Sequence, residues 1–375
     1  MINTALLKRV EISASALLHN LNVLKKRVHS GVEVCCVLKS NAYGHGFSNV
    51  LEIIKHKADA FAVIDLTEAY KIRSRGITGK IINIGFTLPE YTDETVELDV
   101  IPHIYTFVTL KALAESAEKF KKKVKFFIKV ETGMNRCGLK GDELKKIIFF
   151  ASKHKYLTSL GLVTHFAESD VIGSKLTYSQ IEKFQQVRTE FKDFIASDDF
   201  SHAANTAALF LYPDAHFKMI RSGIGLYGMP SSAHVYKAGA DKLMQVLEFK
   251  SRIIHIQEVE KGESVSYGAT WKASKKTKIA IIPVGYADGY FRALSNNNHV
   301  IINESQAKVV GRICMNCFAV DITNIVNAEI GSEVCLISRK SNSGITPDDI
   351  ASKIKTINYE ITTAISENIP RITVT

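Results

Sequence analysis

The sequence predicts an α/β barrel followed by a mainly β domain, and three observations support this prediction. Apolar runs alternate with amphipathic stretches over about the first 220 residues, as in a parallel sheet whose strands are connected by helices. Eight such units suit a closed (β/α)8 TIM-type barrel of about 250 residues. After residue 241, strand-like runs follow one another with only turns between them. We therefore expect a barrel domain at 1–240, whose first residues could pair with the second domain, and a mainly β domain at 241–375.

Each element of the barrel is predicted from hydrophobic periodicity. The chain opens with a helix at Ser13–Val28, because its leucines recur at helical spacing. The eight strands are expected at Val32–Leu38, Ala60–Ile64, Lys80–Ile84, Val100–Tyr105, Val124–Val130, Ser159–His165, Phe200–Ala203 and Phe217–Arg221. Helices between them are expected at Gly46–His56, Thr109–Phe120, Gly141–His154 and Tyr178–Ile195. An open doubly wound sheet is the alternative that this pattern leaves.

The second domain is predicted from closely spaced apolar runs. Its strands are expected at Val246–Gln257, Lys278–Val284, Val300–Asn303, Ala307–Cys314, Phe318–Ile322 and Glu333–Ile337. A helical stretch at Thr346–Ile365 comes late, and the final "RITVT" is expected to be a strand.

Composition excludes several broad classes of protein. The chain has 375 residues, of which 46% are hydrophobic and 23% charged, as in an ordinary globular protein. No apolar run approaches the length of a membrane span, and the N-terminus lacks the residue order of a secretory signal. We expect a cytoplasmic protein that does not enter a membrane.

The net charge of +10 raises nucleic acid as a partner, but its distribution argues against one. Lysine runs such as Lys121–Lys123 lie beside apolar segments without interleaved aromatic residues, as solvated faces do. Cys314 and Cys317 form a single C-x-x-C without a second ligand pair or a thioredoxin-like context. We therefore expect no nucleic acid as a partner, and neither metal binding nor redox use of this cysteine pair.

The chemically reactive residues follow the predicted barrel strands. Because the carboxyl ends of barrel strands share one face, and barrel enzymes keep their active sites there, these residues are expected to meet. Barrels also often bind phosphate with the loops after strands seven and eight. The residues concerned are Lys39, Tyr43, Lys129, Arg136, His165, His202, Asn205, Thr206, Arg221, Gly223 and Ile224.

A lysine at the mouth of a barrel, opposite a phosphate site, suggests pyridoxal phosphate, whose aldehyde forms a Schiff base with lysine. Alone, Lys39 would more often be a solvated strand end, and His165 or His202 an ordinary buried or rim histidine. "GIGLYG", Gly223–Gly228, also matches the dinucleotide fingerprint. That motif must open a helix, and the following "MPSS" does not favour one.

Nine segments together resemble the alanine racemase family, in that family's order and over essentially the whole chain. They are "VLKSNAYGHG", "KVETGMNRCG", "HFAESD", "HAANTA", "RSGIGLYG", "SVSYG", "VGYADGY", "GRICMN" and "INYE". The resemblance implies a pyridoxal-phosphate-dependent isomerase that makes D-alanine for the cell wall and works as a homodimer. It also implies an N-terminal barrel and a C-terminal β domain.

The resemblance also implies roles for individual residues. Lys39 resembles the lysine that bonds the cofactor, and Tyr267 the second catalytic base. Met315 resembles a backbone contact to the substrate carboxylate, and it serves the partner chain's site together with Tyr267. Lys129 matches a lysine that is often carbamylated. The remaining matches are phosphate contacts at Tyr43, Thr206, Gly223, Ile224 and Tyr359, further cofactor contacts at His165 and Asn205, the pyridine-nitrogen partner Arg221 and the substrate-holding Arg136.

Three positions depart from the family pattern. Thr206 replaces the usual serine but keeps the hydroxyl, so phosphate binding is expected to survive. Asn316 replaces a common aspartate and removes a charge near the substrate entrance. The ending "ENIPRITVT" keeps Pro-Arg without the usual tyrosine soon after.

Two bases on opposite faces of the substrate would allow racemisation without one base changing faces. Free lysine and tyrosine have pKa values near 10, so both need lowering at neutral pH. Arg221 and His165 are candidate cations that could lower the pKa of Tyr267. A racemase of broader or serine or lysine specificity, a decarboxylase of similar architecture and a cofactor-binding regulator are the alternatives.

Overall fold

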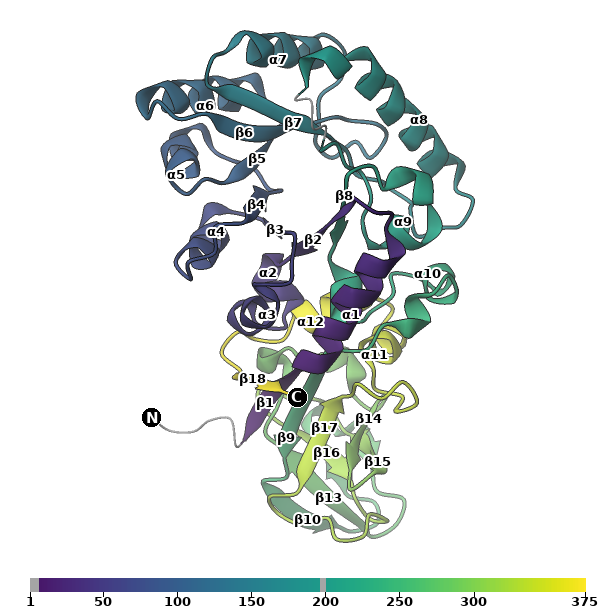
Figure 1. The fold of residues 1–375 in the computed structure, drawn as a ribbon. Coiled ribbons are helices and arrows are strands. Elements are labelled where there is room, and N and C mark those ends of the chain that lie inside the picture. Colours follow the sequence, from purple (N-terminus) through teal and green to yellow (C-terminus); the bar gives the residue numbers. More distant parts are fainter. Residues whose placement is uncertain (1–6, 196–199) are drawn as a thin grey trace. The chain divides into compact units, whose positions relative to one another are not determined.

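The computed structural model describes residues 7–195 and 200–375, which divide into two compact units (Figure 1). The barrel unit consists of His19–Lys39 and Ile54–Leu243. The β unit consists of the described residues up to Leu18, Ser40–Ile53 and Met244–Thr375. Each unit is therefore built from segments that are distant in the sequence.

The barrel unit contains a curled parallel sheet of seven strands in the order β7-β6-β5-β4-β3-β2-β8. The strands are β2 (Glu33–Val37), β3 (Ala60–Val63), β4 (Lys80–Asn83), β5 (Ile101–Ile104), β6 (Val124–Lys129), β7 (Leu157–Val163) and β8 (Met219–Ser222). They are short and almost fully buried, as expected of parallel strands covered by helices. The predicted barrel is confirmed.

The predicted seventh strand, Phe200–Ala203, contributes a single bridging residue. His202 pairs in parallel with Val163 of β7 on one side and with Met219 of β8 on the other. This residue therefore connects the two edge strands of the seven-stranded sheet. The segment is too short to count as a strand, although its backbone lies between β7 and β8, where an eighth strand would close the barrel.

Helices cover the outside of this sheet (Figure 1). Several begin at side-chain caps that the sequence supplies, such as Asp65, Thr106 and Ser174, each of which accepts a backbone N–H three residues on. The helices are α4 (Leu66–Arg73), α5 (Thr92–Glu97), α6 (Phe107–Lys119), α7 (Gly141–Lys153), α8 (Lys175–Glu190), α9 (Thr206–Leu211) and α10 (Ala233–Lys237). Helix α1 (Ala14–Arg27) begins in the β unit and ends in the barrel unit.

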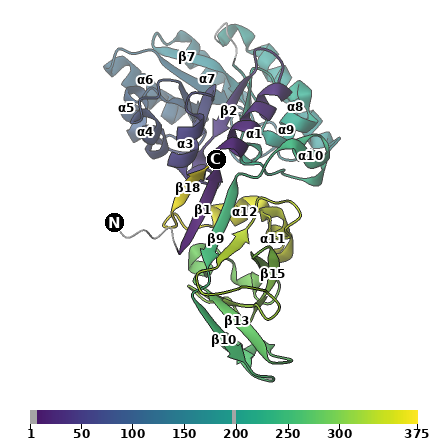
Figure 2. The same ribbon diagram turned by 60° about the horizontal axis from the view of Figure 1, so that its bottom comes forward.

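The β unit contains a nine-stranded sheet in the order β10-β13-β16-β15-β14-β17-β9-β1-β18. The first strand of the chain, β1 (Lys8–Ser13), pairs antiparallel with β9 (Leu247–Arg252) and parallel with the last strand, β18 (Arg371–Val374) (Figure 2). The other strands of this sheet are β10 (His255–Val259), β13 (Thr277–Ile282), β14 (His299–Ile302), β15 (Ser305–Val310), β16 (Phe318–Asp321) and β17 (Glu333–Ile337). The mainly β second domain is confirmed.

Shorter elements complete the β unit. Strands β11 (Ser264–Val265) and β12 (Trp271–Lys272) form a separate hairpin. The helices are α3 (Phe47–Ile54), α11 (Pro347–Ile354) and α12 (Asn358–Thr363). The predicted helical stretch at 346–365 is thus two short helices rather than one, because Lys355 adopts a left-handed conformation at the end of α11.

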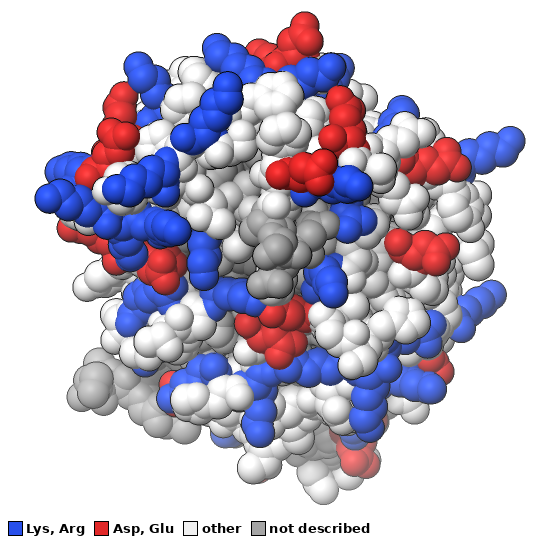
Figure 3. All heavy atoms as spheres, turned by 45° about the horizontal axis from the view of Figure 1, so that its top comes forward, with Lys and Arg blue, Asp and Glu red and all other residues white. Residues whose placement is uncertain are grey.

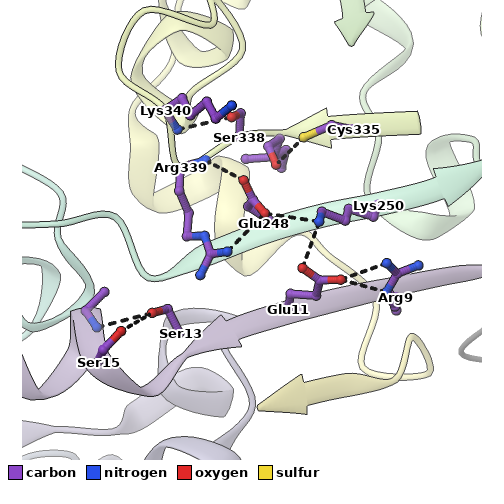
Figure 4. Close-up of polar contacts among 12 residues, drawn as sticks. Arg9, Glu11, Ser13, Ser15, Glu248, Lys250, Cys335, Ser338, Arg339 and Lys340 are labelled. Carbon is purple, nitrogen blue, oxygen red and sulfur yellow. Dashed lines mark hydrogen bonds and ion pairs between the residues drawn. The ribbon is translucent and has the colours of Figure 1, made fainter. Parts of the chain in front are cut away.

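A network of ionic side chains joins β1, β9 and β17. Figure 4 shows the part of it formed by Arg9, Glu11, Glu248, Lys250 and Arg339. Lys250 Nζ lies 2.9 Å from Glu11, 3.4 Å from Glu248 and 3.2 Å from Glu333. Arg9 pairs with Glu11 at 2.7 Å, and Arg339 with Glu248 at 3.2 Å. Three acids and three bases balance, so charges that are largely buried are compensated where the N-terminal strand joins the sheet.

The surface charges are mixed rather than gathered by sign. On the face shown in Figure 3, basic and acidic side chains are interspersed. Some pair directly, such as Lys119 with Asp93 and Lys111 with Glu115. Within the described parts of the chain, no helix is both long and apolar enough to cross a bilayer.

Candidate active site

Lys39 stands at the carboxyl end of β2, where the sequence placed it. The preceding residues Val34–Leu38 are buried, whereas Lys39 itself is half-buried. Burial lowers the pKa of Lys39, the charge of Arg136 and more weakly that of Lys129 lower it further, and Glu68 acts in the opposite direction. This shift increases the share of neutral amine, which is the nucleophilic form of lysine.

A left-handed turn follows Lys39 directly. Ser40, Asn41, Ala42 and Tyr43 have φ of 55°, 53°, 53° and 55°, although none is glycine. Each such residue costs about 1–2 kcal/mol relative to right-handed backbone. Strain of this kind persists only where the surrounding contacts fix it, and it is often found at functional sites.

Contacts inside the β unit hold this turn. Arg371 donates through Nη2 to Gly44 O at 3.0 Å and to Ile365 O at 2.9 Å. A Cβ on Gly44 would lie 1.9 Å from the carbonyl oxygen of Thr362, so α12 approaches the turn as closely as only glycine permits. Tyr43, the last residue of the turn, lies with its ring centroid 6.1 Å from that of Tyr359 on α12.

A second group of predicted residues gathers at the carboxyl ends of β6, β7 and β8 in the barrel unit. Lys129 is buried, and its ammonium group lies 6.0 Å from the ring centroid of Tyr105. Burial lowers the pKa of Lys129; Cys137 opposes this effect through its charge and a hydrogen bond, while Arg221 and Arg136 add to it. The cluster is electropositive, which suits an anionic ligand.

Arg221 is the buried centre of this cluster. It comes from β8, and its Nη2 donates to Thr164 O at 2.9 Å and to Ala203 O at 3.0 Å. Burial lowers its pKa to about 10, so the guanidinium is still charged at neutral pH. Its Nη1 has no hydrogen-bond partner among the described residues, and a buried donor of this kind calls for a ligand.

His165 contacts Arg221 through Nδ1 at 3.2 Å. Burial is the main reason why the pKa of His165 lies well below its usual range, and the charges of Arg221 and Arg136 reinforce the shift. His165 is therefore neutral, and our expectation that it could act as a cation toward Tyr267 was wrong. The neutral ring can accept a hydrogen bond from the guanidinium instead.

Thr206 and the loop after β8 form a small polar cluster. Thr206 Oγ1 accepts from the backbone N–H of Gly225 at 3.2 Å and lies 3.2 Å from Ser222 Oγ. A Cβ on Gly225 would lie 2.5 Å from Thr206 Cγ2, so the glycine is required for this approach. Asn205 caps α9, accepting from Ala208 N at 3.0 Å.

The "GIGLYG" segment does not open a dinucleotide-binding helix. Gly223 and Ile224 begin a single 3-10 turn, Ile224–Tyr227, which ends at Gly228 with φ of 81°. Gly223 and Ile224 follow β8 at the carboxyl end of the barrel, next to the polar cluster at Thr206.

In the β unit, Tyr267 lies on a strained hairpin turn between β11 and β12. Its side chain is 71% exposed. Ser266 before it has φ of 67° and ψ of −178°, a region that is essentially restricted to glycine and costs about 1–3 kcal/mol. Ser266 Oγ donates to Arg312 O at 2.6 Å and thereby holds the turn.

Met315 lies on a neighbouring turn and is 55% exposed. Its carbonyl oxygen accepts from Ala287 N at 3.0 Å, and that of Cys314 accepts from Tyr286 N at 3.1 Å. A Cβ on Gly285 would lie 2.3 Å from Met315 O, so the backbone of the "GYAD" segment packs directly against the Met315 turn.

The predicted site residues therefore fall into two sets. The barrel unit brings together Lys39, Lys129, Arg136, His165, Asn205, Thr206, Arg221, Gly223 and Ile224, and the β unit carries Tyr43, Tyr267, Met315 and Tyr359. Three structural residues escaped sequence reasoning: Glu68, whose charge acts on Lys39, Ser266 and Arg371. The Pro-Arg pair near the C-terminus was the one signal that could have indicated Arg371.

These residues fit pyridoxal phosphate. Nη1 of buried Arg221, which has no partner among the described residues, suits an uncharged ring nitrogen or another acceptor. The polar cluster at Thr206 offers hydroxyl and backbone donors to a phosphate. Lys39, with its lowered pKa, suits an aldehyde.

Comparison with known proteins finds one family that matches nearly the whole chain. The family described as "Alanine racemase, N-terminal domain" matches residues 12–231, and "Alanine racemase, C-terminal domain" matches residues 246–373. The alanine racemase of Carboxydothermus hydrogenoformans is 38% identical over 96% of this chain and 98% of its own length. Alanine racemase 2 of Caldanaerobacter subterraneus subsp. tengcongensis is 35% identical, covering 97% of this chain and 94% of that protein. The solved structure of the Clostridium difficile 630 alanine racemase superposes with a TM-score of 0.91 at 33% identity, covering 98% of this chain and 95% of that one.

Proposed function

Because the chain belongs to the alanine racemase family, we propose that it interconverts L- and D-alanine with pyridoxal phosphate as cofactor. The single observation that carries this proposal is Lys39 at a carboxyl strand end, with its pKa lowered by burial and neighbouring cations. When bound, the cofactor holds the amino group of the substrate and withdraws electrons from Cα. By family analogy, the product supplies D-alanine for peptidoglycan in the cytoplasm.

The barrel residues would hold the cofactor. Lys39 would bond its aldehyde carbon, and Arg221 would face its ring nitrogen. Because Arg221 remains charged at neutral pH, it would donate a hydrogen bond to this nitrogen without giving up a proton. His165, kept neutral, would accept from Arg221 and fix its orientation. The phosphate would be held by Thr206, Gly223 and Ile224 with Asn205 beside them, and by Tyr43 and Tyr359.

Two bases would move the proton. Lys39 Nζ, as a free amine, would serve one face of Cα, and the phenolic oxygen of Tyr267 would serve the other. Lowering of the Lys39 pKa raises the fraction of free amine near neutral pH, which a general base requires. Each residue would then take a proton in one direction of reaction and return one in the other.

Arg136 and Met315 would bind the substrate carboxylate, through the guanidinium and the backbone N–H respectively. Lys129 would react with carbon dioxide as a neutral amine, and the resulting carbamate would place an anion beside Arg136. Support for this comes from the burial and lowered pKa of Lys129, since only the unprotonated amine forms a carbamate. Electron density beyond Nζ in a crystal of the holoenzyme would test it.

A homodimer would complete each site. Tyr267 and Met315 are both more than half exposed in one chain, which leaves them accessible to a second copy. We propose that they serve the partner's active site. Sedimentation of the holoenzyme gives the oligomeric state. Mixing Lys39→Ala chains with Tyr267→Phe chains should restore part of the activity, because one hybrid site keeps both bases.

The decisive test is chiral chromatography of L-alanine incubated with protein and cofactor, with L-serine and L-lysine in parallel. Conversion of alanine alone toward an equal mixture is expected. Turnover of serine or lysine at a similar rate would indicate a broad-specificity racemase instead. No D-isomer from any of the three would refute the proposal.

A further inference from the structure

Two cysteines flank the turn that carries Met315. Cys314 and Cys317 enclose Met315 and Asn316 between β15 and β16, and the backbone N–H of Cys314 donates to Cys317 O at 2.9 Å. Because Cα is one bond from the donor nitrogen and two bonds from the acceptor oxygen, this hydrogen bond holds the two Cα atoms within about 7 Å, which a disulfide can span.

The two thiols also interact with each other. Burial raises the pKa of the Cys317 thiol, and the charge of Cys314 and a hydrogen bond with it raise it further. Both cysteines are half-buried free thiols. The two thiols are therefore neighbours that a small oxidant can reach. In the proposed function alanine, which is larger than such an oxidant, must reach Met315 between them.

Cys314 also connects this turn to Tyr267. Its Sγ donates to Arg312 O at 3.6 Å and lies 3.4 Å from Ser266 Oγ. Ser266 Oγ itself donates to the same Arg312 carbonyl at 2.6 Å. The thiol thus supports the strained residue that immediately precedes Tyr267.

From this geometry we infer that Cys314 and Cys317 are a site of reversible disulfide formation that lowers the racemase activity. The bond draws Cys314 Sγ toward Cys317, removes its S–H donor from Arg312 O and fixes the turn of Met315. Ser266 then loses a neighbour, and the tyrosine that it positions is displaced. The effect on activity rests on the proposed function, whereas the disulfide itself does not.

The oxidant is a hydroperoxide, and the atoms balance in two steps. Each thiol first gives up its proton. One thiolate attacks an oxygen of hydrogen peroxide, the O–O bond breaks, and the leaving hydroxide takes one thiol proton to become water, which leaves a sulfenic acid. The second thiolate attacks that sulfur, the S–O bond breaks as the S–S bond forms, and the leaving hydroxide takes the second thiol proton to become a second water. Two electrons pass from the sulfurs to the peroxide, and a dithiol reverses the reaction.

The experiment treats holoenzyme with hydrogen peroxide and follows disulfide content and activity separately. Peptide mass spectrometry after alkylation should find Cys314 linked to Cys317. The ratio kcat/KM for L-alanine should fall about tenfold, as for a small misplacement of a catalytic group, and dithiothreitol should restore it. Cofactor absorbance should be unchanged, because the displaced residues, Ser266, Tyr267 and Met315, are not among those proposed to hold the cofactor.

Cys317→Ser is the matched control, since it cannot form the bond but keeps the Cys314 thiol beside Ser266. It should have wild-type activity and resist peroxide. Equal peroxide sensitivity of Cys317→Ser would place the oxidation elsewhere, for example at Cys137, and overturn the inference. Absence of the linked peptide at full loss of free thiols would overturn it as well. A protein that racemises nothing but forms the disulfide would refute the proposed function and the effect on activity, and leave the modification site standing.

Discussion

Replacing Thr206 with valine would test the proposed phosphate contact of its hydroxyl with the smallest change in side-chain shape. The Thr206 side chain is 3% exposed, and its hydroxyl accepts from Gly225 N–H at 3.2 Å. Valine keeps the methyl group that packs against Gly225 and substitutes a second methyl for the hydroxyl. Thr206→Ser is the matched control, because it keeps the hydroxyl and removes the methyl.

The expected loss has two parts. A hydrogen bond to a charged phosphate contributes about 1.5–3 kcal/mol, so its loss should weaken cofactor binding about tenfold to a hundredfold. The buried N–H of Gly225 also loses its acceptor in the free and the bound protein alike. That part should lower the free energy of unfolding by about 1–3 kcal/mol without changing affinity.

Cofactor affinity is measured by titrating the apoprotein with pyridoxal phosphate and following the visible absorbance of the bound form. Urea unfolding of the same apoproteins gives the stability part. Thr206→Ser should stay close to wild type in affinity. If Thr206→Val bound the cofactor as tightly as wild type, Thr206 would not be a phosphate contact, whatever its effect on stability.

Three further predictions concern the supports of the site. In Glu11, burial would raise the pKa, but hydrogen bonds from Lys250 and Arg9 outweigh it and leave the pKa below the ordinary 4.5. The folded state then binds fewer protons than the unfolded one, so this stabilisation, complete above the unfolded value, disappears as pH falls through the folded one. Acid unfolding of Glu11→Gln should therefore be less steep with pH than that of wild type, and the exposed Glu182→Gln should match wild type; equal slopes in all three would count against the network. Arg371→Met should lower cofactor affinity, because the left-handed turn before Gly44 loses its supports; unchanged affinity on titration would show that the turn holds itself. Gly285→Ala should raise KM for alanine more than it lowers kcat, because its methyl group would displace Met315, and the opposite split would contradict the assigned carboxylate contact.

Much of the barrel could be predicted because its signals are local. A buried parallel strand such as Ala60–Val63 is a short apolar run, and the residue at its end is visible in the sequence. The barrel rule then assigns such ends to one face without knowledge of any contact. Lys39 and Arg221 could be proposed for this reason alone.

The seventh strand and the protonation of His165 could not be predicted in the same way. His202 bridges β7 and β8 through backbone position, which composition does not encode. The state of His165 depends on burial and on Arg221, which is 56 residues away in sequence. A pKa is a property of the assembled surroundings, so residue type indicates only what a group can do.

The turn after Lys39 shows the same limit more sharply. Ser40–Tyr43 contain no glycine, and of their side chains only that of Asn41 is of a type often found in left-handed backbone. The energy that holds them there comes from Arg371 and from the bare backbone of Gly44 against α12. The last segment of the chain therefore determines the conformation of a turn near its beginning. This arrangement fixes the direction in which Lys39 is presented, because a strained turn that is held by contacts from other segments has one conformation rather than several.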